Sequence, residues 1–305
     1  MTVCDMHADT LTLHGQNRLF SSYNRSLEHP HLQFFAHFVK SGGKAPSLRR
    51  KRLMKMHEKY LRLTEREKIL KITDKESLSS AQAVGCRSMA VFSIEGGGGL
   101  FADSRELDFL CESGLRIFGM AWDKNELCAS AGEYGRDDFG LTEKGKELAE
   151  KLESLGIIPD ISHMSDAAVY GISDCLNGPL IATHSNFRAV CKSQRNLTDA
   201  QALEIQRRGG IVGINMYPPF LSDASEADIY DIIRHIDYGL SLIGEESLAL
   251  GLDIDGTSGK YPPPFSEKES IHDSLLNALS KEYKEKTLEK IFGINVLNFL
   301  KTHLK

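Results

Sequence analysis

The sequence predicts an α/β fold, a (β/α)8 barrel of the TIM type whose functional site lies at the C-terminal ends of the strands. Short, almost wholly apolar runs recur along the 305 residues, and charged amphipathic segments separate them. Apolar runs of this kind suit parallel strands that are covered on both faces. In addition, ionisable side chains stand directly after several of these runs. In a barrel, such positions converge on one face.

Eight apolar runs are predicted to form strands. They span residues 3–9, 33–39, 88–94, 115–121, 157–161, 179–183, 211–216 and 248–252. Eight strands that alternate with helices are most economically a closed barrel, and we expect a single domain over 1–305. An open, doubly wound sheet is the rival architecture. Its dinucleotide-binding version has little support, because no G-x-G-x-x-G motif follows the first strand.

Helices and loops are expected between these strands. Segments 142–155 and 225–243 are amphipathic, and TDAQ at 198–201 has the form of a capping box that opens another helix. Residues 40–70 predict a charged helix that contains RRKR; acidic residues follow at once, so we interpret the run as a solvated face and not as a nucleic-acid site. Three consecutive prolines place 255–270 in a loop after the eighth strand.

Composition argues against several classes of protein. The chain is 41% hydrophobic and 26% charged, and its net charge of −5 provides no field that attracts nucleic acid or an anionic membrane. Its six cysteines are scattered, so we expect reduced thiols and no zinc ribbon. No apolar run approaches the roughly 20 residues that cross a bilayer. We find no signal peptide or lipidation signal and expect a cytoplasmic location.

The ionisable residues at the strand ends form a candidate metal site. His7 and Asp9 end the first strand, where alternate side chains point to the same side. Glu95 ends the third strand, His163 the fifth and His184 the sixth. Any one of them fits a structural role. Their joint position at strand C-termini instead favours a shared site.

This donor set suits two divalent metal ions, for which zinc is the natural choice. Three imidazoles and two carboxylates are nitrogen and oxygen donors of the type that zinc takes. Five ligands are too many for one catalytic zinc, but they suit two ions that share a carboxylate. Glu95 is the natural bridge, because both of its oxygens can ligate. Asp253 and Asp255 follow the eighth strand on the same face.

The other histidines are interpreted as structural or solvated, since they lie in loops, helices or mid-strand without matching partners. They are His14, His29, His31, His37, His57, His235, His272 and His303.

Six motifs in this order resemble the membrane (renal) dipeptidase family: DMHADT, SIEGG, DISHMSD, ATHSN, RNLTD and GLDIDG. The resemblance runs from Asp5 to about Gly256. It implies a metal-dependent hydrolase barrel with two zinc ions that hydrolyses the amide bond of a dipeptide, with a C-terminal D-residue among the candidate substrates. The attacking group would be a hydroxide that bridges the metals.

The resemblance also assigns metal ligands. His7 and Asp9 would hold one zinc, His163 and His184 the other, and Glu95 would bridge the two ions.

Further roles follow from the resemblance alone. Asp253, in preference to Asp255, would handle the proton. Arg195 would hold the C-terminal carboxylate of the dipeptide in two hydrogen bonds, although a surface position before a helix cap is the alternative. Tyr217 would lie near the substrate, and a packed loop aromatic is equally consistent with its position.

The sequence departs from the family after the fourth strand. The mammalian enzymes carry a histidine there that is thought to stabilise the tetrahedral intermediate. In this sequence, the segment GMAWDKNEL has Trp122 at that position. An indole N–H donates a hydrogen bond but cannot carry a proton. Asn125 is a candidate substitute donor. The resemblance therefore implies the metal site of the mammalian enzymes but not their rate or specificity.

Two other functions stay open. One is a different metal-dependent hydrolase on the same barrel, with an N-acyl amino acid, lactone or lactam as substrate; Arg195 discriminates, because only a peptide-like acid needs its charge. The other, motivated by Trp122, is a catalytically weak protein that binds dipeptides. The expected partner is a small dipeptide, with no nucleic acid and no membrane. A homodimer is expected from the family alone.

Overall fold

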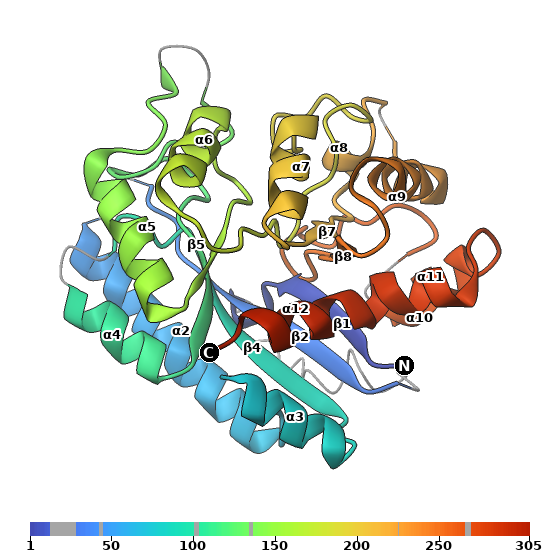
Figure 1. The fold of residues 1–305 in the computed structure, drawn as a ribbon, viewed down its shortest axis with the longest axis horizontal. Helices are drawn as coiled ribbons and strands as arrows, with labels where there is room; N and C mark the ends of the chain where they lie inside the picture. Colours follow the sequence, from blue (N-terminus) through green and yellow to red (C-terminus); the bar gives the residue numbers. More distant parts are fainter. Residues whose placement is uncertain (13–28, 43–44, 101–103, 134–136, 225, 266–269) are drawn as a thin grey trace.

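Parallel strands curl around a common centre, and helices cover the outside of the sheet (Figure 1). The computed structural model of this chain describes residues 1–12, 29–42, 45–100, 104–133, 137–224, 226–265 and 270–305. His14 lies outside the described residues.

Eight strands make up the sheet, in the order β6-β5-β4-β2-β1-β8-β7, with β3 beside β4. Their bounds are β1 (Val3–Ala8), β2 (His31–Phe38), β3 (Leu70–Lys71), β4 (Ser88–Glu95), β5 (Leu115–Gly119), β6 (Ile158–Asp160), β7 (Val212–Ile214) and β8 (Leu248–Leu250). Each pairing is parallel. This is the parallel architecture that the apolar runs predict.

The run predicted as a strand at 179–183 joins the two ends of the sheet, but as two isolated bridges and not as a ladder. Ile181 bridges to Asp160 of β6, and Ala182 bridges to Val212 of β7. The next residue leaves the ladder because the Asp160 carboxylate accepts the Thr183 N–H at 3.0 Å. Segment 181–182 therefore closes a ring with the seven strands of the ordered path, and the predicted barrel is confirmed.

The two-residue strand β3 was not predicted from the sequence. It pairs with Met89 and Ala90 in the first half of β4, whereas β5 pairs with β4 from Phe92 onward. Since β2 pairs with β4 along its whole length, β3 and β5 share the other edge of β4. Both residues of β3 are exposed, so no apolar pattern marks them.

The helices lie between and around the strands. They are α2 (Pro46–Arg66), α3 (Lys75–Ala83), α4 (Ser104–Glu112), α5 (Glu143–Leu155), α6 (Asp166–Cys175), α7 (Asp199–Arg207), α8 (Pro218–Leu221), α9 (Ile229–Ile243), α10 (Ile271–Leu279), α11 (Glu285–Glu289) and α12 (Asn295–His303), with a short 3-10 helix η1 (Thr10–Thr12) and a short π-helix η3 (Lys290–Ile294). In these described segments, no helix has both the length and the apolar character that crossing a bilayer requires.

Local sequence signals explain several helix ends. Thr198 and Gln201 form both hydrogen bonds of a capping box at the start of α7, as TDAQ predicts. Thr142 caps α5, which ends at Gly156 with a left-handed φ of 73°. The RRKR run lies on α2, where Arg49 is buried and pairs with Glu126 at 2.8 Å. Part of that run is thus packed and not solvated, in contrast to our interpretation.

Apolar side chains form two layers. Alternate strand residues such as Leu32, Phe34, Met89 and Val91 pack together with α12 in one cluster. Their strand neighbours pack against the surrounding helices in a larger cluster. The alternation follows from the period of two along a strand, and it places every second residue of β4, and hence Glu95 at its end, on the inner side.

A bulge interrupts β1 just before the predicted metal ligands. Asp5 pairs with Gln33 and Ala8 with Phe35, so β1 has one more residue than β2 over this stretch. Bulges re-aim side chains beside functional sites. Simple alternation would send Asp5 and His7 to the same side, but Asp5 contacts His272 of α10 whereas His7 faces Glu95.

Candidate metal centre

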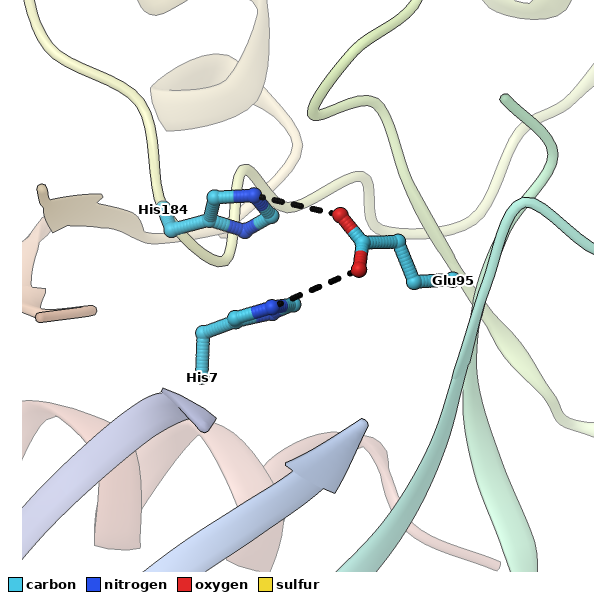
Figure 2. Close-up of side chains that lie close together, drawn as sticks. All are labelled: His7, Glu95 and His184. Carbon is cyan, nitrogen blue, oxygen red and sulfur yellow. Dashed lines mark ion pairs between the residues drawn. The ribbon is translucent and has the colours of Figure 1, made fainter. Parts of the chain in front are cut away.

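The five predicted metal ligands meet at the C-terminal end of the ring. His7 lies on β1 and Asp9 directly follows it, Glu95 is the last residue of β4, His163 follows β6, and His184 follows the closing segment. Figure 2 shows the imidazoles of His7 and His184 pointing to the Glu95 carboxylate. The structure therefore brings together side chains that lie up to 177 residues apart, from position 7 to position 184.

The Glu95 carboxylate divides the ligands into two sets. Its Oε2 lies 3.6 Å from Nε2 of His7. Its Oε1 lies 2.9 Å from Nε2 of His163 and 3.5 Å from Nε2 of His184. Asp9 Oδ2 stands on the His7 side, 3.6 Å from the same Nε2. Each oxygen of the Glu95 carboxylate therefore faces its own set of donors: Oε2 faces His7, and Oε1 faces His163 and His184.

These residues fit divalent metal ions. The ligand atoms of His7, Glu95 and His184 lie within 4.8 Å of one another, as do those of His7, Asp9 and Asp253. Nε2 of His7, Oδ1 of Asp9 and Oε2 of Glu95 are buried and have no hydrogen-bond partner in the described part of the chain. Buried polar atoms are rarely left unpaired, and cations coordinate donors of this kind.

Electrostatics favour a cation at this site. Burial raises the pKa of Glu95 to about 7, even though the neighbouring His7 lowers it. Burial and nearby positive groups hold the pKa values of His163 and His184 well below the usual range. Both imidazoles are therefore neutral at pH 7, and their Nε2 atoms, which lie 3.0 Å apart, are nitrogen donors of the kind that binds a metal. Burial disfavours charge on His7 as well, but Glu95 and Asp9 outweigh it and keep its pKa well above the usual value.

Two of the site residues adopt left-handed backbone conformations. His163 has a φ of 68° and Asp253 a φ of 60°. Residues other than glycine rarely adopt such angles, and they persist where the surroundings enforce them, often at functional sites. In both cases the chain turns sharply after a strand, which directs the side chain into the end of the ring.

His184 is oriented by a hydrogen-bonded chain that was not predicted. Its Nδ1 lies 2.8 Å from the Thr183 hydroxyl, which donates to Oδ2 of Asp160. The other oxygen of Asp160 accepts the N–H groups of Ser162 and Thr183, each at 3.0 Å. Partners of this type fix the tautomer and the orientation of a metal-binding imidazole. The Nε2 of His184 is left to face Glu95.

Asp253 shares one face of the site with the predicted ligands. Its Oδ1 lies 3.9 Å from Nε2 of His7, and its Oδ2 accepts a hydrogen bond from Asn215 at 3.2 Å. Burial raises the pKa of Asp253. Asn215 was not predicted, although it directly follows β7, because its amide does not ionise and so does not belong to the pattern of ionisable strand-end residues. Asp255 belongs to neither group of candidate metal ligands among the described residues, and its backbone N–H donates to the Tyr261 hydroxyl.

Arg195 is buried beside the site. Its Nη1 donates to Ser185 at 2.9 Å, and its Nη2 donates to the backbone carbonyl of His184 at 3.1 Å. Its Nε is buried without a hydrogen-bond partner among the described residues. Burial lowers its pKa to about 10, so it stays charged at neutral pH. The surface position that was the alternative for this residue is therefore wrong.

Two other residues that we predict to contact the substrate, Trp122 and Tyr217, have different neighbours in the structure. The Trp122 ring centroid lies 6.0 Å from that of His163. The Tyr217 ring packs on Phe220, which the Arg195 guanidinium overlies.

Asn125 turns into its own loop. Its Nδ2 donates to the Met120 carbonyl, and its Oδ1 accepts the N–H groups of Leu127 and Cys128. With both polar atoms engaged in this way, Asn125 braces the loop.

Comparison with protein families identifies the chain. The membrane dipeptidase model, peptidase family M19, matches residues 16–304. The chain belongs to the membrane dipeptidase family. The resemblance seen in the six motifs is thereby confirmed, and so is the prediction, at the level of the family, of a metal-dependent dipeptidase.

Individual relatives agree with this membership of the membrane dipeptidase family. A Klebsiella pneumoniae protein, described as an uncharacterized protein in the pqqA 5′ region, is 34% identical over 238 residues, which is 73% of this chain and 87% of that protein. Mouse dipeptidase 3 is 26% identical over 231 residues, 74% of this chain but only 46% of the mouse protein. This chain thus matches about half the length of that dipeptidase.

A solved structure shares the fold. The crystal structure of a metallopeptidase from Rhodobacter sphaeroides, liganded with a phosphinate mimic of the dipeptide L-Ala-D-Ala, has a TM-score of 0.88 and 24% sequence identity, and the alignment covers 99% of each chain. At this identity the likeness supports the barrel fold.

Proposed function

We propose that this protein hydrolyses the peptide bond of dipeptides, using two zinc ions held by His7, Asp9, Glu95, His163 and His184. The observation that carries the proposal is the carboxylate of Glu95. One oxygen faces His7, and the other faces His163 and His184. This is the arrangement that a bridging ligand between two ions requires. When bound, such ions would activate a water molecule at neutral pH and polarise the scissile carbonyl.

Asp253 is the proposed proton carrier. It lies on the same face as the ligands, and Asn215 holds one of its oxygens while the other points toward His7. Asp253 takes a proton from the attacking water and delivers it to the leaving amine. The oxygen of water joins the carbonyl carbon, the C–N bond breaks, and two amino acids leave.

Arg195 is proposed to select substrates by their free C-terminus. A guanidinium carries five N–H donors, and the described contacts of Arg195 use two of them. The remaining donors can hold a carboxylate, and a charged hydrogen bond of this kind contributes about 1.5–3 kcal/mol. Because Arg195 bonds to the backbone carbonyl of His184, a carboxylate held there would limit substrates to short peptides with a free C-terminus.

Trp122 and the substrate's stereochemistry complete the proposal. Trp122 lies beside His163 and has no group that carries a proton, so we assign it to covering the substrate and excluding water. The ligand of the Rhodobacter sphaeroides structure mimics L-Ala-D-Ala, which supports a C-terminal D-residue among the substrates here.

Elemental analysis of metal content, on the same preparation that is assayed with L-L and L-D dipeptides, tests the proposal. We expect about two zinc ions per chain, release of amino acids that a chelator abolishes, and little turnover of the matching dipeptide amides, which lack the carboxylate. Two bound metals with no turnover of any dipeptide would contradict the proposed substrate and favour an N-acyl amino acid, lactone or lactam, or simple binding. A chain that takes up no metal would contradict the site itself.

A further inference from the structure

A buried polar cluster lies behind the metal centre, where β1 and β2 meet α10. Its members are Asp5 of β1, His31 and Gln33 of β2, and His272 of α10, and each side chain's residue is at most 3% exposed. None of the four was assigned a role in the site. From the sequence, both histidines were expected to be structural or solvated.

The carboxylate of Asp5 accepts three hydrogen bonds. Its Oδ1 accepts the backbone N–H of His7 at 3.2 Å and that of Leu252 at 3.0 Å. Its Oδ2 accepts from Nε2 of His272 at 3.0 Å. One side chain thus holds the backbone at a predicted metal ligand and at the residue directly before Asp253.

This carboxylate occupies a gap in the sheet. In the described part of the chain, β1 and β8 are joined by the pair Asp5–Leu250 and by the bridge Ala8–Ile254. The residues between these two points, which include His7 and Asp253, have no ladder partner across the seam. The Asp5 side chain therefore supplies the N–H groups of His7 and Leu252 with the acceptor that a regular ladder would provide.

His31 and Gln33 hold this arrangement in register. Gln33 pairs with Asp5 across the ladder, and its Nε2 donates to the Asp5 carbonyl at 3.1 Å. Nε2 of His31 lies 3.2 Å from Oε1 of Gln33. The His31 ring meets the edge of the His272 ring at a centroid distance of 4.7 Å. His272 is consequently confined on one side by His31 and bonded on the other to Asp5.

We propose that His272 is a positioning residue that acts through Asp5, so that α10 fixes the relative placement of His7 and Asp253. The inference rests on the proposed function only in naming Asp253 as the proton carrier; its claim about the metal site stands on the contacts alone. If His272 loses its N–H, Oδ2 of Asp5 remains buried without a partner, and the carboxylate must rotate or draw in water. Either response releases the backbone of His7 and Leu252.

The test compares His272→Phe, which removes the donor, with His272→Gln, which keeps an amide donor. His57→Gln is the matched control, because His57 is a buried histidine on α2 that stacks on Phe92, and among the described residues no hydrogen bond joins it to a predicted metal ligand. Zinc affinity by chelator competition and the visible absorption spectrum of the cobalt-loaded protein are measured for each.

For His272→Phe we expect about a 10–100-fold loss of zinc affinity and a changed cobalt spectrum, as for other contacts that orient metal ligands. With zinc saturating, kcat falls while KM for a dipeptide changes less than about threefold, since Arg195 has no bond to this cluster. His272→Gln should recover most of the affinity, and His57→Gln should match the wild type in both readouts.

An unchanged affinity and spectrum in His272→Phe would overturn the inference. Should that variant fail to fold because it leaves a buried charge, Asp5→Asn/His272→Phe removes the charge and takes its place, with the same loss expected relative to Asp5→Asn. If the wild-type protein hydrolyses no dipeptide, the proposed function fails, yet the affinity and cobalt spectrum still decide the role of His272.

Discussion

The hydroxyl of Thr183 joins a buried carboxylate to a predicted metal ligand. It receives the Nδ1–H of His184 and donates its own proton to Asp160. Thr183→Val preserves the shape and removes this link. Because the imidazole then loses its fixed tautomer, we expect zinc affinity to fall about 10–100-fold. Chelator competition measures the change.

Thr183→Ser is the matched control for that variant, since it retains the hydroxyl and loses only a methyl group. It should bind zinc within about threefold of the wild type. Equal affinities for the valine and serine variants would show that the Asp160–Thr183–His184 chain has no influence on the metal.

Asp253 is the residue on which the proton transfer depends. Asp253→Asn keeps the size and the partner Asn215 but cannot accept a proton. General acid–base catalysis contributes about 10²–10⁴-fold, so kcat should fall by that factor while the metal content stays at the wild-type level. Steady-state kinetics on a metal-loaded preparation measure this. Full activity with metals bound would mean that the proton passes elsewhere.

At the scale of the secondary-structure elements, the segment 181–182 that closes the ring packs closely against β7 and the end of β8, and this close packing requires glycine at both places. A Cβ on Gly251 would lie 1.8 Å from the Thr183 carbonyl oxygen, and one on Gly213 would lie 2.1 Å from the same atom. Two backbones therefore approach Thr183 from β7 and from the end of β8. Gly251→Ala must push the segment outward, together with His184. We expect both a lower melting temperature and weaker zinc binding.

Gly132→Ala is the control for this close approach. A Cβ at Gly132 would meet its nearest atom, the Ser130 hydroxyl, at 4.0 Å. We expect its melting temperature to stay within about 2 °C of the wild type, because a tolerated surface change alters stability by about 0.5 kcal/mol or less. If Gly251→Ala were equally harmless, the tight packing of the closing segment would not constrain His184.

The sequence predicted those elements whose signal is local. Periodic apolar runs locate β1 and β4 to within a residue or two, and TDAQ locates the start of α7. The strand-end rule then collects His7, Glu95 and His184, because parallel strands in a ring must end on one face. No side-chain contact is needed for that inference.

What the sequence did not predict depends on contacts between distant segments. Segment 181–182 has only two bridges because Asp160 takes the next N–H, and the bulge in β1 is set by pairing with β2. His272 has no sequence neighbour that marks it as more than a helix residue, and its partner Asp5 is 267 residues away. Such contacts carry no periodicity that a single sequence can reveal.

At the scale of the whole molecule, buried neutral histidines link stability to pH. Burial lowers the pKa of His31 and of His37 to about 3, and that of His235 to about 4. In the unfolded chain a histidine titrates near 6.5. Between these values the unfolded state binds protons that the folded state does not. Stability therefore rises with pH in this window and falls as the pH drops from about 6.5 toward 4.

His37 isolates this effect from the metal centre. Its Nδ1 contacts the Ser93 carbonyl at 3.0 Å, and His37→Gln keeps an amide donor there without a titrating group. When the pH drops from 7 to 5, the free energy of unfolding of the wild type should fall by about 2 kcal/mol more than that of the variant, because of this one histidine. Urea unfolding of both proteins, in buffer that contains a chelator, measures the difference. The titration of His7, His163 and His184 is common to both proteins and cancels in the comparison. Parallel pH profiles would mean that His37 is protonated in the folded barrel, or that water reaches it.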